Sequence, residues 1–234
     1  MKVSDATSAH AMRGVRLLME AYVGGELPHW DVFASQARII RLEPGQTLFS
    51  AGEPHPYVYY IERGLMKAQM GVDGGRRQAT VFFSEEGEVM ASMPSLAVPG
   101  IQRALSRGLH PRVPALQAAA SGTSVHTVTA LEPCVLMKGP FRVIEQLALQ
   151  HIEWSQLVTA LVVMYATTLQ IDTAWFRGTP EQRYRDLLAE HPGLIDRVTQ
   201  RDLANYLNIT SVALSRIAKR VRSEEVSKPQ PGRS

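Results

Sequence analysis

The sequence predicts an α+β fold, in which an antiparallel β-roll is followed by a long helix and then by a C-terminal helix-turn-helix. Three observations support this prediction. Short apolar runs separated by turn signals extend from Arg38 to Leu136, apolar residues recur at alternating three- and four-residue spacings from Trp154 to Trp175, and Gln200–Arg222 has the pattern of two short helices joined by a tight turn. The expected domains are residues 1–139, 140–178 and 179–234.

Composition restricts the class of protein. The chain has 234 residues, of which 45% are hydrophobic and 20% charged, as is typical of a globular protein of two small domains. Its single cysteine, Cys134, excludes an internal disulfide and a four-cysteine iron–sulfur cluster, and it favours a reducing cytoplasm. We find no signal peptide and no apolar run near the roughly 20 residues of a membrane span. We therefore expect a cytoplasmic protein with no membrane contact.

The β-roll is expected to follow an N-terminal helix over Ala9–Val23. Its strands are short apolar or aromatic runs bounded by glycine, proline and aspartate, which is typical of an antiparallel roll or barrel. Asp73-Gly74-Gly75 predicts a hairpin between two of these strands. The expected strands are Ile39–Leu42, Thr47–Ser50, Tyr57–Ile61, Leu65–Val72, Gln78–Phe83, Val125–Leu131 and Cys134–Met137.

One proline-rich segment, Pro94–Gly122, interrupts the roll. A loop of this length inside a compact domain is either functional or mobile. We expect a surface excursion. An anion site that uses Arg103, Arg107 and Arg112 is the alternative.

A long helix is expected within Pro140–Gly178. Its 3-4 spacing is that of a coiled-coil seam, which favours dimerisation along the helix, although burial within one chain is the alternative. Thr168 is the polar break in the seam, where it would set the register or touch a ligand. The predicted dimer interface comprises Trp154, Leu157, Leu161, Met164, Thr168, Ile171 and Trp175.

The segment Gln200–Arg222 predicts a helix-turn-helix. Its inward residues are expected to be Leu203, Leu207, Ile209, Leu214 and Ile217, with Ala204 where the two helices approach most closely. Asn208 falls where the turn needs a left-handed backbone, and Thr210 falls where it would cap the second helix. An ordinary helical hairpin is the alternative, but the agreement of these independent positions favours the DNA-binding motif.

Charge and exposure indicate which residues would meet double-stranded DNA. Residues 176–222 hold nine basic and five acidic side chains, an excess that suits contact with phosphates. Arg216 is the candidate for reading a guanine, Val212 for apolar contact with a thymine methyl, and Lys219 for phosphate. The full set of predicted DNA-binding residues is Thr199, Gln200, Thr210, Ser211, Val212, Ser215, Arg216 and Lys219.

Several motifs together resemble the CRP/FNR family of transcription regulators. They are Pro44-Gly45, Leu48-Phe49, Ala51-Gly52-Glu53, Tyr57–Lys67, Asp73-Gly74-Gly75 and the Leu214-Ser215-Arg216-Ile217 core of the helix-turn-helix. The resemblance implies a cyclic-nucleotide-binding-like sensor domain, a dimerisation helix and a winged-helix-like DNA-binding domain. It also implies a homodimer that binds a two-fold symmetric promoter site and contacts RNA polymerase, and it implies no enzymatic activity. The short chain after Arg222 leaves little room for a β-hairpin wing.

The cyclic-nucleotide pocket of that family is not matched. Its Gly-Glu pair would fall on Ala91-Ser92, and its Arg-Ser/Thr-Ala triplet on Ser124-Val125-His126. Without a guanidinium a buried cyclic phosphate would be costly, so we expect no cyclic AMP binding in the usual mode. A different effector, of unknown identity, would meet Ala91, Ser92, Ser124, Val125 and Thr168.

Two other functions are weighed against this one. A cupin-like enzyme or small-molecule-binding protein would need clustered histidines and a carboxylate, which the expected strands lack, so no catalytic residue is predicted. The second alternative, a DNA-binding regulator that senses a nucleotide through a rebuilt pocket, is left open by the sequence. The seven histidines show no metal-ligand spacing, so no metal site is predicted, although haem ligation by one histidine or by Cys134 stays open. Cys134 lies in an apolar run and is expected to be inert core.

Overall fold

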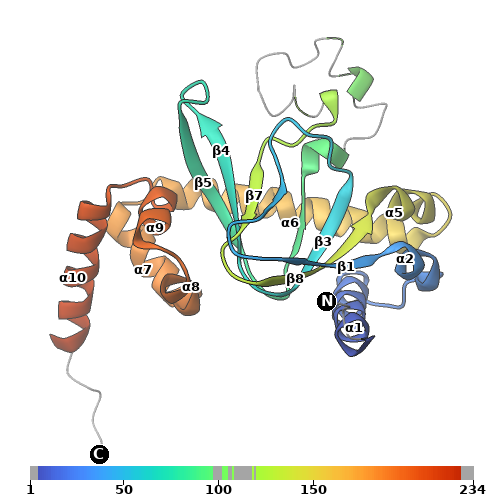
Figure 1. Cartoon of the computed structure of the whole chain (residues 1–234), viewed down its shortest axis with the longest axis horizontal. Coiled ribbons are helices and arrows are strands. Elements are labelled where there is room, and N and C mark those ends of the chain that lie inside the picture. Colours follow the sequence, from blue (N-terminus) through green and yellow to red (C-terminus); the bar gives the residue numbers. More distant parts are fainter. Residues whose placement is uncertain (1–4, 97–101, 105–106, 108–117, 119, 228–234) are drawn as a thin grey trace, which may run out of the picture. The chain divides into compact units, whose positions relative to one another are not determined.

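The computed structural model describes residues 5–96, 102–104, 107, 118 and 120–227, and it forms two compact units, Met1–Tyr165 and Ala166–Ser234 (Figure 1). The division falls inside helix α6 (Ile152–Phe176) and not at the predicted boundaries 139/140 and 178/179. The reason is that the start of α6 packs in the core of the first unit, whereas its end packs in the second. Most of Pro94–Gly122, including His110 and Arg112, lies outside the described residues.

The first unit contains the predicted antiparallel roll, built of two four-stranded sheets (Figure 1). One sheet has the order β1-β8-β3-β6 and the other β2-β7-β4-β5, and every pairing in them is antiparallel. The tight β4–β5 hairpin turns at Asp73, Gly74 and Gly75, all with positive φ, as the sequence predicts. The strands are β1 (Arg38–Leu42), β2 (Thr47–Phe49), β3 (Tyr57–Arg63), β4 (Met66–Val72), β5 (Arg77–Ser84), β6 (Val89–Ala91), β7 (Thr127–Ala130) and β8 (Cys134–Pro140).

Side chains from both sheets fill the interior of the roll. Phe49, Tyr59, Met66 and Leu136 are among its buried residues, so this core holds large apolar groups. Cys134 is buried there, and burial raises the pKa of its thiol, as expected of an inert core cysteine. Gly64 makes this packing possible, because its φ is +105° and a Cβ there would lie 2.5 Å from the Cys134 sulfur.

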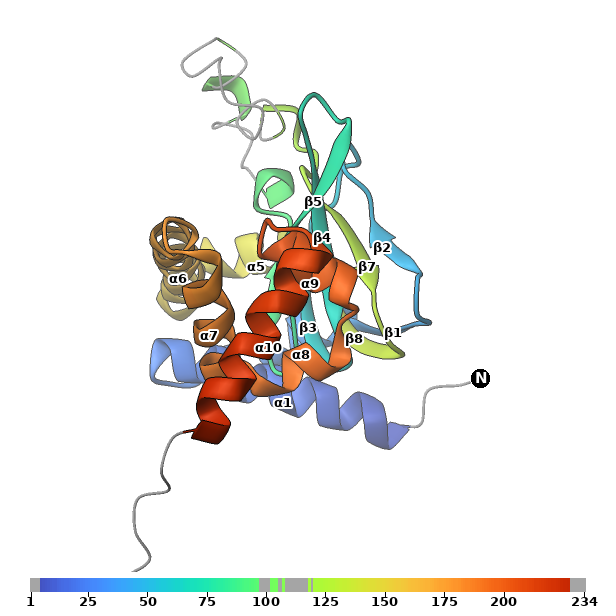
Figure 2. The same cartoon turned by 90° about the vertical axis from the view of Figure 1, so that its left-hand side faces the viewer.

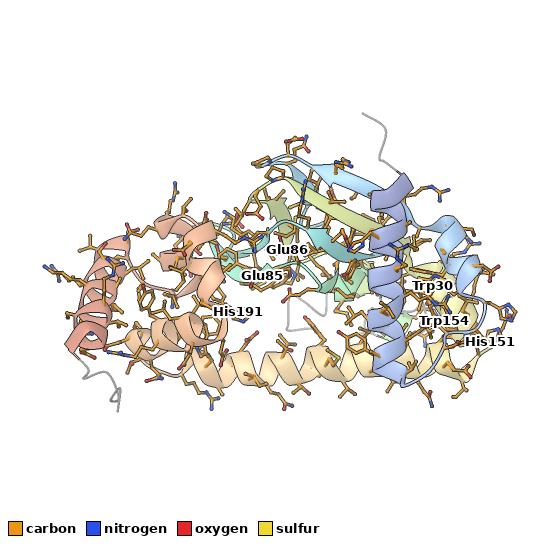
Figure 3. The ribbon with its side chains drawn as sticks, turned by 90° about the horizontal axis from the view of Figure 1, so that it is seen from below. Trp30, Glu85, Glu86, His151, Trp154 and His191 are labelled. Atoms are coloured by element: carbon orange, nitrogen blue, oxygen red, sulfur yellow. The ribbon has the colours of Figure 1, made fainter. Side chains whose placement is uncertain are left out.

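Helices cover one of the two sheets and form a second core with it. They are α1 (Asp5–Val23), α2 (Trp30–Gln36), α5 (Phe141–Ala148) and the start of α6. Trp30 and Trp154 stack with their ring centroids 6.2 Å apart, and the Trp154 indole donates to the Pro28 carbonyl at 2.7 Å (Figure 3). Neither α2, β6 nor the short 3-10 helix η1 (Met93–Leu96) is predicted from the sequence. The single helix expected over 140–178 is in fact two helices, α5 and α6.

Helix α6 differs from the predicted seam at its start. Trp154 and Leu157 are fully buried in the core of their own chain, so they are not available to a partner, and Leu161 is partly buried against the same core. Met164 is 44% exposed and Ile171 62%, as an unpaired interface would be. Further exposed apolar residues on the helix are Ile152, Val162, Val163, Tyr165, Leu169 and Phe176.

The same helix bears on the expectation about membrane spans. Helix α6 has 25 residues and contains an 18-residue stretch that is apolar enough, by length and composition alone, to cross a membrane. The polar residues that interrupt its apolar runs hid this property, because the expectation considered only uninterrupted runs. An exposed apolar surface of this kind marks a site of contact with another protein chain or with a membrane.

Candidate nucleic-acid interface

In its described residues, 166–227, the second unit consists of helices joined by short turns and contains no strand. Beyond the end of α6 it consists of α7 (Pro180–Glu190), α8 (Pro192–Arg197), α9 (Gln200–Tyr206) and α10 (Ser211–Ser227). Threonines cap three of these helices. Thr179 accepts from the Gln182 amide at 3.2 Å, Thr199 accepts from the Asp202 amide at 3.1 Å, and Thr210 caps α10. The chain that would form a β-hairpin wing after α10 lies outside the described residues, because α10 extends to Ser227.

The turn between α9 and α10 has the geometry that the sequence predicts. Asn208 adopts a left-handed conformation with φ +53°, and the Ile209 amide donates to the Ala204 carbonyl at 2.9 Å. Thr210 caps α10, because its hydroxyl oxygen accepts from the Ala213 amide at 3.2 Å. These contacts fix the direction in which α10 leaves α9 (Figure 2).

The two helices share one core. Leu203, Ala204, Leu207, Leu214 and Ile217 are buried, as predicted, whereas Ile209 is only partly buried. Val221 of α10 and Tyr184, Leu187 and Leu194 of the preceding helices are also buried. One face of α10 is thus fixed against the unit and its opposite face is left to solvent.

The eight predicted DNA-binding residues all lie on the exposed surface of α9, α10 and the residues that cap them. Val212 is 64% exposed, so its methyl groups are available for contact with a partner. Arg216 and Lys219 are exposed and have no carboxylate partner among the described residues. The Gln200 side-chain amide donates to the Ser215 hydroxyl at 2.9 Å, a contact between the two helices that sequence reasoning did not anticipate.

The hydroxyl groups of Thr199 and Thr210 already make hydrogen bonds within the protein, which limits what they can offer to DNA. The Thr199 hydroxyl accepts from the Asp202 amide and also donates to the Asp202 carboxylate at 2.9 Å, so its hydrogen is already used. Thr210 uses a lone pair for its cap and keeps its hydrogen for a further acceptor.

An ion-pair network occupies the side of the unit formed by α7 and α10. Arg185 contacts Glu181 at 2.8 Å and Glu224 at 2.5 Å, and Arg220 pairs with Glu181. Arg220 is thus already neutralised within the unit, which argues against a role in holding phosphate. The i,i+4 spacing of Glu181 and Arg185 was visible in the sequence, but the link to α10 was not.

Arg183 was also missed by sequence reasoning, and it is buried. Its guanidinium donates to the carbonyls of Phe176, Gly178 and Leu207 at 3.0, 2.7 and 2.8 Å. Phe176 ends α6 and Leu207 ends α9, so one cation caps the carboxyl ends of two helices, where the helix dipole favours positive charge. It therefore joins the end of α6 to the helix-turn-helix.

Aromatic rings surround the same junction. Tyr206 lies 5.4 Å from Trp175 and 6.2 Å from Phe176, between ring centroids. Burial raises the pKa of Tyr206 to about 12, with smaller contributions from Asp172 and Glu190. Burial also raises the pKa of Asp172. The predicted interface residue Trp175 is thus engaged within its own unit.

The predicted effector residues are mostly engaged by neighbouring residues. Ser92 is buried and accepts from the Ser95 hydroxyl at 3.0 Å, while Ser124 is buried and bonds the backbone of His126. Ala91 and Val125 are partly buried, and Thr168 is exposed on α6. A cavity of about 370 Å³ lies elsewhere, lined mainly by residues of α2 and α5 together with His29 and His151. Among the described residues no group of three or more His, Cys, Asp or Glu side chains could hold a metal ion.

No protein-family model and no curated protein matches this chain. Several solved structures do match it. FixK2 from Bradyrhizobium japonicum matches with a TM-score of 0.60 and 17% identity, over 84% of this chain and 90% of that one. A protein of the CRP/FNR family from Eubacterium rectale matches with a TM-score of 0.57 and 11% identity, over 87% and 86%. The chain has the CRP/FNR fold.

The likeness extends beyond these two structures and beyond the roll. The c-di-GMP-responsive global regulator CLP from Xanthomonas campestris matches with a TM-score of 0.55 and 15% identity, over 84% of this chain and 91% of that one. Matches of this coverage reach past Tyr165, so they include residues of both units. The resemblance on which the fold was predicted is thereby confirmed. In the CRP/FNR fold of this chain, α9 and α10 form the helix-turn-helix.

Proposed function

We propose that the protein is a DNA-binding transcription regulator and not an enzyme. The observation that supports this most directly is the exposed face of α10. Ser211, Val212, Ser215, Arg216 and Lys219 face solvent there, while Leu214, Ile217 and Val221 fix the helix from behind. In a helix-turn-helix such a helix enters the major groove and its first turns meet the base edges.

The roles of the residues follow from their chemistry. Arg216 can donate two hydrogen bonds to guanine, and Val212 offers apolar contact to a thymine methyl. Lys219 and the hydroxyls of Thr210 and Ser211 are suited to phosphate or base acceptors. The excess of basic over acidic residues in 176–222 supplies the non-specific attraction to the duplex.

A homodimer joined along α6 is part of the proposal. The exposed apolar residues from Val162 to Ile171 form a larger apolar surface than a monomer in water is expected to leave uncovered. A second copy of the chain would bury this surface. Two copies related by a two-fold axis would present two α10 helices to a two-fold symmetric promoter site. Contact with RNA polymerase, and action in the cytoplasm, belong to the same proposal.

We propose no response to cyclic AMP in the usual mode. The positions expected to hold its ribose and phosphate are Ala91-Ser92 and Ser124-Val125-His126, and they offer no guanidinium. The alternative is a rebuilt nucleotide pocket, which CLP makes worth testing because that protein is named as c-di-GMP-responsive. Thermal unfolding with cyclic AMP, cyclic GMP and c-di-GMP separates the two, since a bound ligand raises the melting temperature.

The decisive experiment is a titration of labelled random-sequence duplex DNA with the full chain at low salt, followed by anisotropy. We expect binding that weakens steeply as salt rises, because Lys and Arg side chains displace counterions from phosphates. Retention of no duplex from the pool would contradict the proposal. Binding that does not depend on salt would also contradict it.

A further inference from the structure

The hydrogen bond between Gln200 and Ser215 links the first residue of α9 to the second turn of α10. The Gln200 amide nitrogen donates to the Ser215 hydroxyl oxygen at 2.9 Å, and both side chains are exposed. Figure 2 shows α9 and α10 side by side, as their shared buried core requires. Ser215 therefore lies on the proposed DNA-facing surface with its orientation set by the neighbouring helix.

Other hydroxyls in helices of this chain behave differently. Thr159 and Thr173 each donate to the backbone carbonyl four residues earlier, at 2.9 and 2.7 Å. Such a bond uses the hydroxyl hydrogen within the helix. In the described part of the chain the side-chain bond of Ser215 is instead the one that it accepts from Gln200.

This difference fixes what Ser215 can offer to a ligand. A hydroxyl has one hydrogen to donate and two lone pairs to accept with. Since Gln200 occupies one lone pair, the hydrogen and the second lone pair are left on the outer side of the hydroxyl. The bases then differ in whether they can accept this hydrogen in the major groove. Guanine, adenine and thymine present acceptors there, whereas cytosine presents an amino donor.

We infer that Gln200 is a positioning residue that keeps the hydrogen of the Ser215 hydroxyl available to DNA, so that a base presenting an acceptor to Ser215 is favoured over cytosine. The inference rests on the proposed function. It assigns the specificity at one base position to a pair of residues on two helices. Arg216 would read a separate position through its guanidinium.

The test is selection of binding sites from a random duplex pool by the wild type and by Ser215→Ala, Gln200→Ala and Gln200→Glu. We expect Ser215→Ala and Gln200→Ala to lose the preference against cytosine at the same position. The affinity for the best wild-type site should fall about 2- to 10-fold, as expected for one hydrogen bond. Both side chains are exposed, so the melting temperatures should stay near that of the wild type.

The Gln200→Glu variant tests the direction of the bond. A carboxylate only accepts, so the Ser215 hydrogen would turn toward it and leave only lone pairs for the DNA. The preference at that position should then move toward cytosine. The double variant Gln200→Glu, Ser215→Ala is the matched control, because it keeps the added negative charge and removes the hydroxyl, and it should show no such move.

The outcomes are distinguishable. An unchanged sequence preference in Ser215→Ala overturns the inference, and so does a uniform loss of affinity for all sequences, which would indicate a phosphate contact. A cytosine shift that persists in the double variant overturns it as well, since the charge alone would then be the cause. If the wild type retains no duplex, the proposed function itself fails.

Discussion

Arg216 is the residue whose removal should change what the protein reads. It is exposed on α10, one turn beyond Val212, and can bond a guanine in two places. Arg216→Ala is expected to cost about 1–3 kcal/mol on the preferred site and to relax the base preference at one position. Lys219→Ala is the matched control, because loss of a phosphate contact weakens all sequences alike and lowers the salt dependence.

Competition between the selected site and random duplex measures both effects. An Arg216→Ala variant with unchanged affinity and unchanged sequence preference would contradict the placement of α10 in the groove.

Asn208 is expected to matter for stability and not for chemistry. Its φ of +53° suits asparagine and glycine, whereas other residues with a Cβ are strained there by about 1–2 kcal/mol. Asn208→Ala should therefore destabilise the second unit by about 1 kcal/mol, and Asn208→Gly should be close to neutral. Hydrogen exchange of the amides in α9 and α10 reports this local stability. Equal protection in the two variants would contradict the explanation.

Some of these residues could be predicted from the sequence and others could not. Thr199, Asn208 and Thr210 act on backbone groups within a few residues, so their roles were visible in the local pattern. The bond from Gln200 to Ser215 spans 15 residues and depends on the crossing of two helices. A local pattern holds no information about such a crossing, and for that reason the pair was proposed only as two separate contacts.

Among the helices of the second unit, the junction held by Arg183 is the most consequential. Arg183→Met would keep apolar contact near Trp175 and Phe176 but would leave three carbonyls without their donor, one in a buried bond and two in partly buried bonds. Loss of a buried partner costs about 1–3 kcal/mol and the partly buried bonds add less, so we expect a loss of about 3 kcal/mol. The loss would appear as faster hydrogen exchange in α7 and α9.

Arg185→Met is the control for that variant, because Arg185 is a neighbour on the same helix whose ion pairs are partly exposed. Its cost should stay within about 1 kcal/mol. Equal costs for the two variants would contradict the special role of the Arg183 guanidinium.

The β-roll should be sensitive to acid through His55. Its ring bonds the Tyr59 hydroxyl at 2.6 Å, and burial, aided by the charge of Lys138, lowers the pKa of His55 from 6.5 to about 4. A histidine pKa that is lower in the folded state means that the neutral ring is favoured there. Its contribution to stability is therefore complete above pH 6.5 and is lost as the pH falls toward 4.

Urea unfolding of the wild type across that range should show decreasing stability, and His55→Gln should show a shallower decrease. Some slope should persist, because burial also lowers the pKa of His126. An identical slope in the variant would rule out His55 as a source of the acid sensitivity.

Element prediction succeeded where a periodic pattern was long or a turn was marked, and it failed at short or interrupted elements. Strands bounded by glycine and proline were placed within a few residues, whereas β6 has three residues and no alternation to detect. Helix α2 has seven residues and begins after His29, whose positive φ gives no sign in sequence. The break between α5 and α6 was missed because residues 149–151, where it falls, include no glycine or proline to mark it.

At the scale of the whole molecule, the seam on α6 was only half predictable. A 3-4 spacing indicates that one face of a helix is buried, but it does not say whether the same chain or a second copy buries it. Trp154 and Leu157 are buried by their own chain, while Met164 and Ile171 are exposed. The distinction depends on where the roll ends along the helix, which follows from the packing of Trp154 against Trp30 and Phe33.

The exposed part of α6 therefore decides the assembly. In a two-fold symmetric dimer each substitution occurs twice across the interface, so one buried charge has a doubled effect. Met164→Glu is expected to convert the dimer to a monomer at micromolar concentration and to weaken binding to a two-fold symmetric site, as seen by sedimentation and by DNA titration. Leu17→Glu is the control, because Leu17 is an exposed leucine on α1, outside the proposed interface, and should leave the dimer intact.

A wild type that sediments as a monomer would contradict the dimer. If that monomer also bound to lipid vesicles, and Met164→Glu abolished the binding, the apolar surface of α6 would be a membrane contact, as its length and hydropathy permit. We expect the opposite result, a dimer that ignores vesicles. Burial of Met164 and Ile171 of both copies against one another would cover one face of the helix and reduce the apolar surface available to lipid.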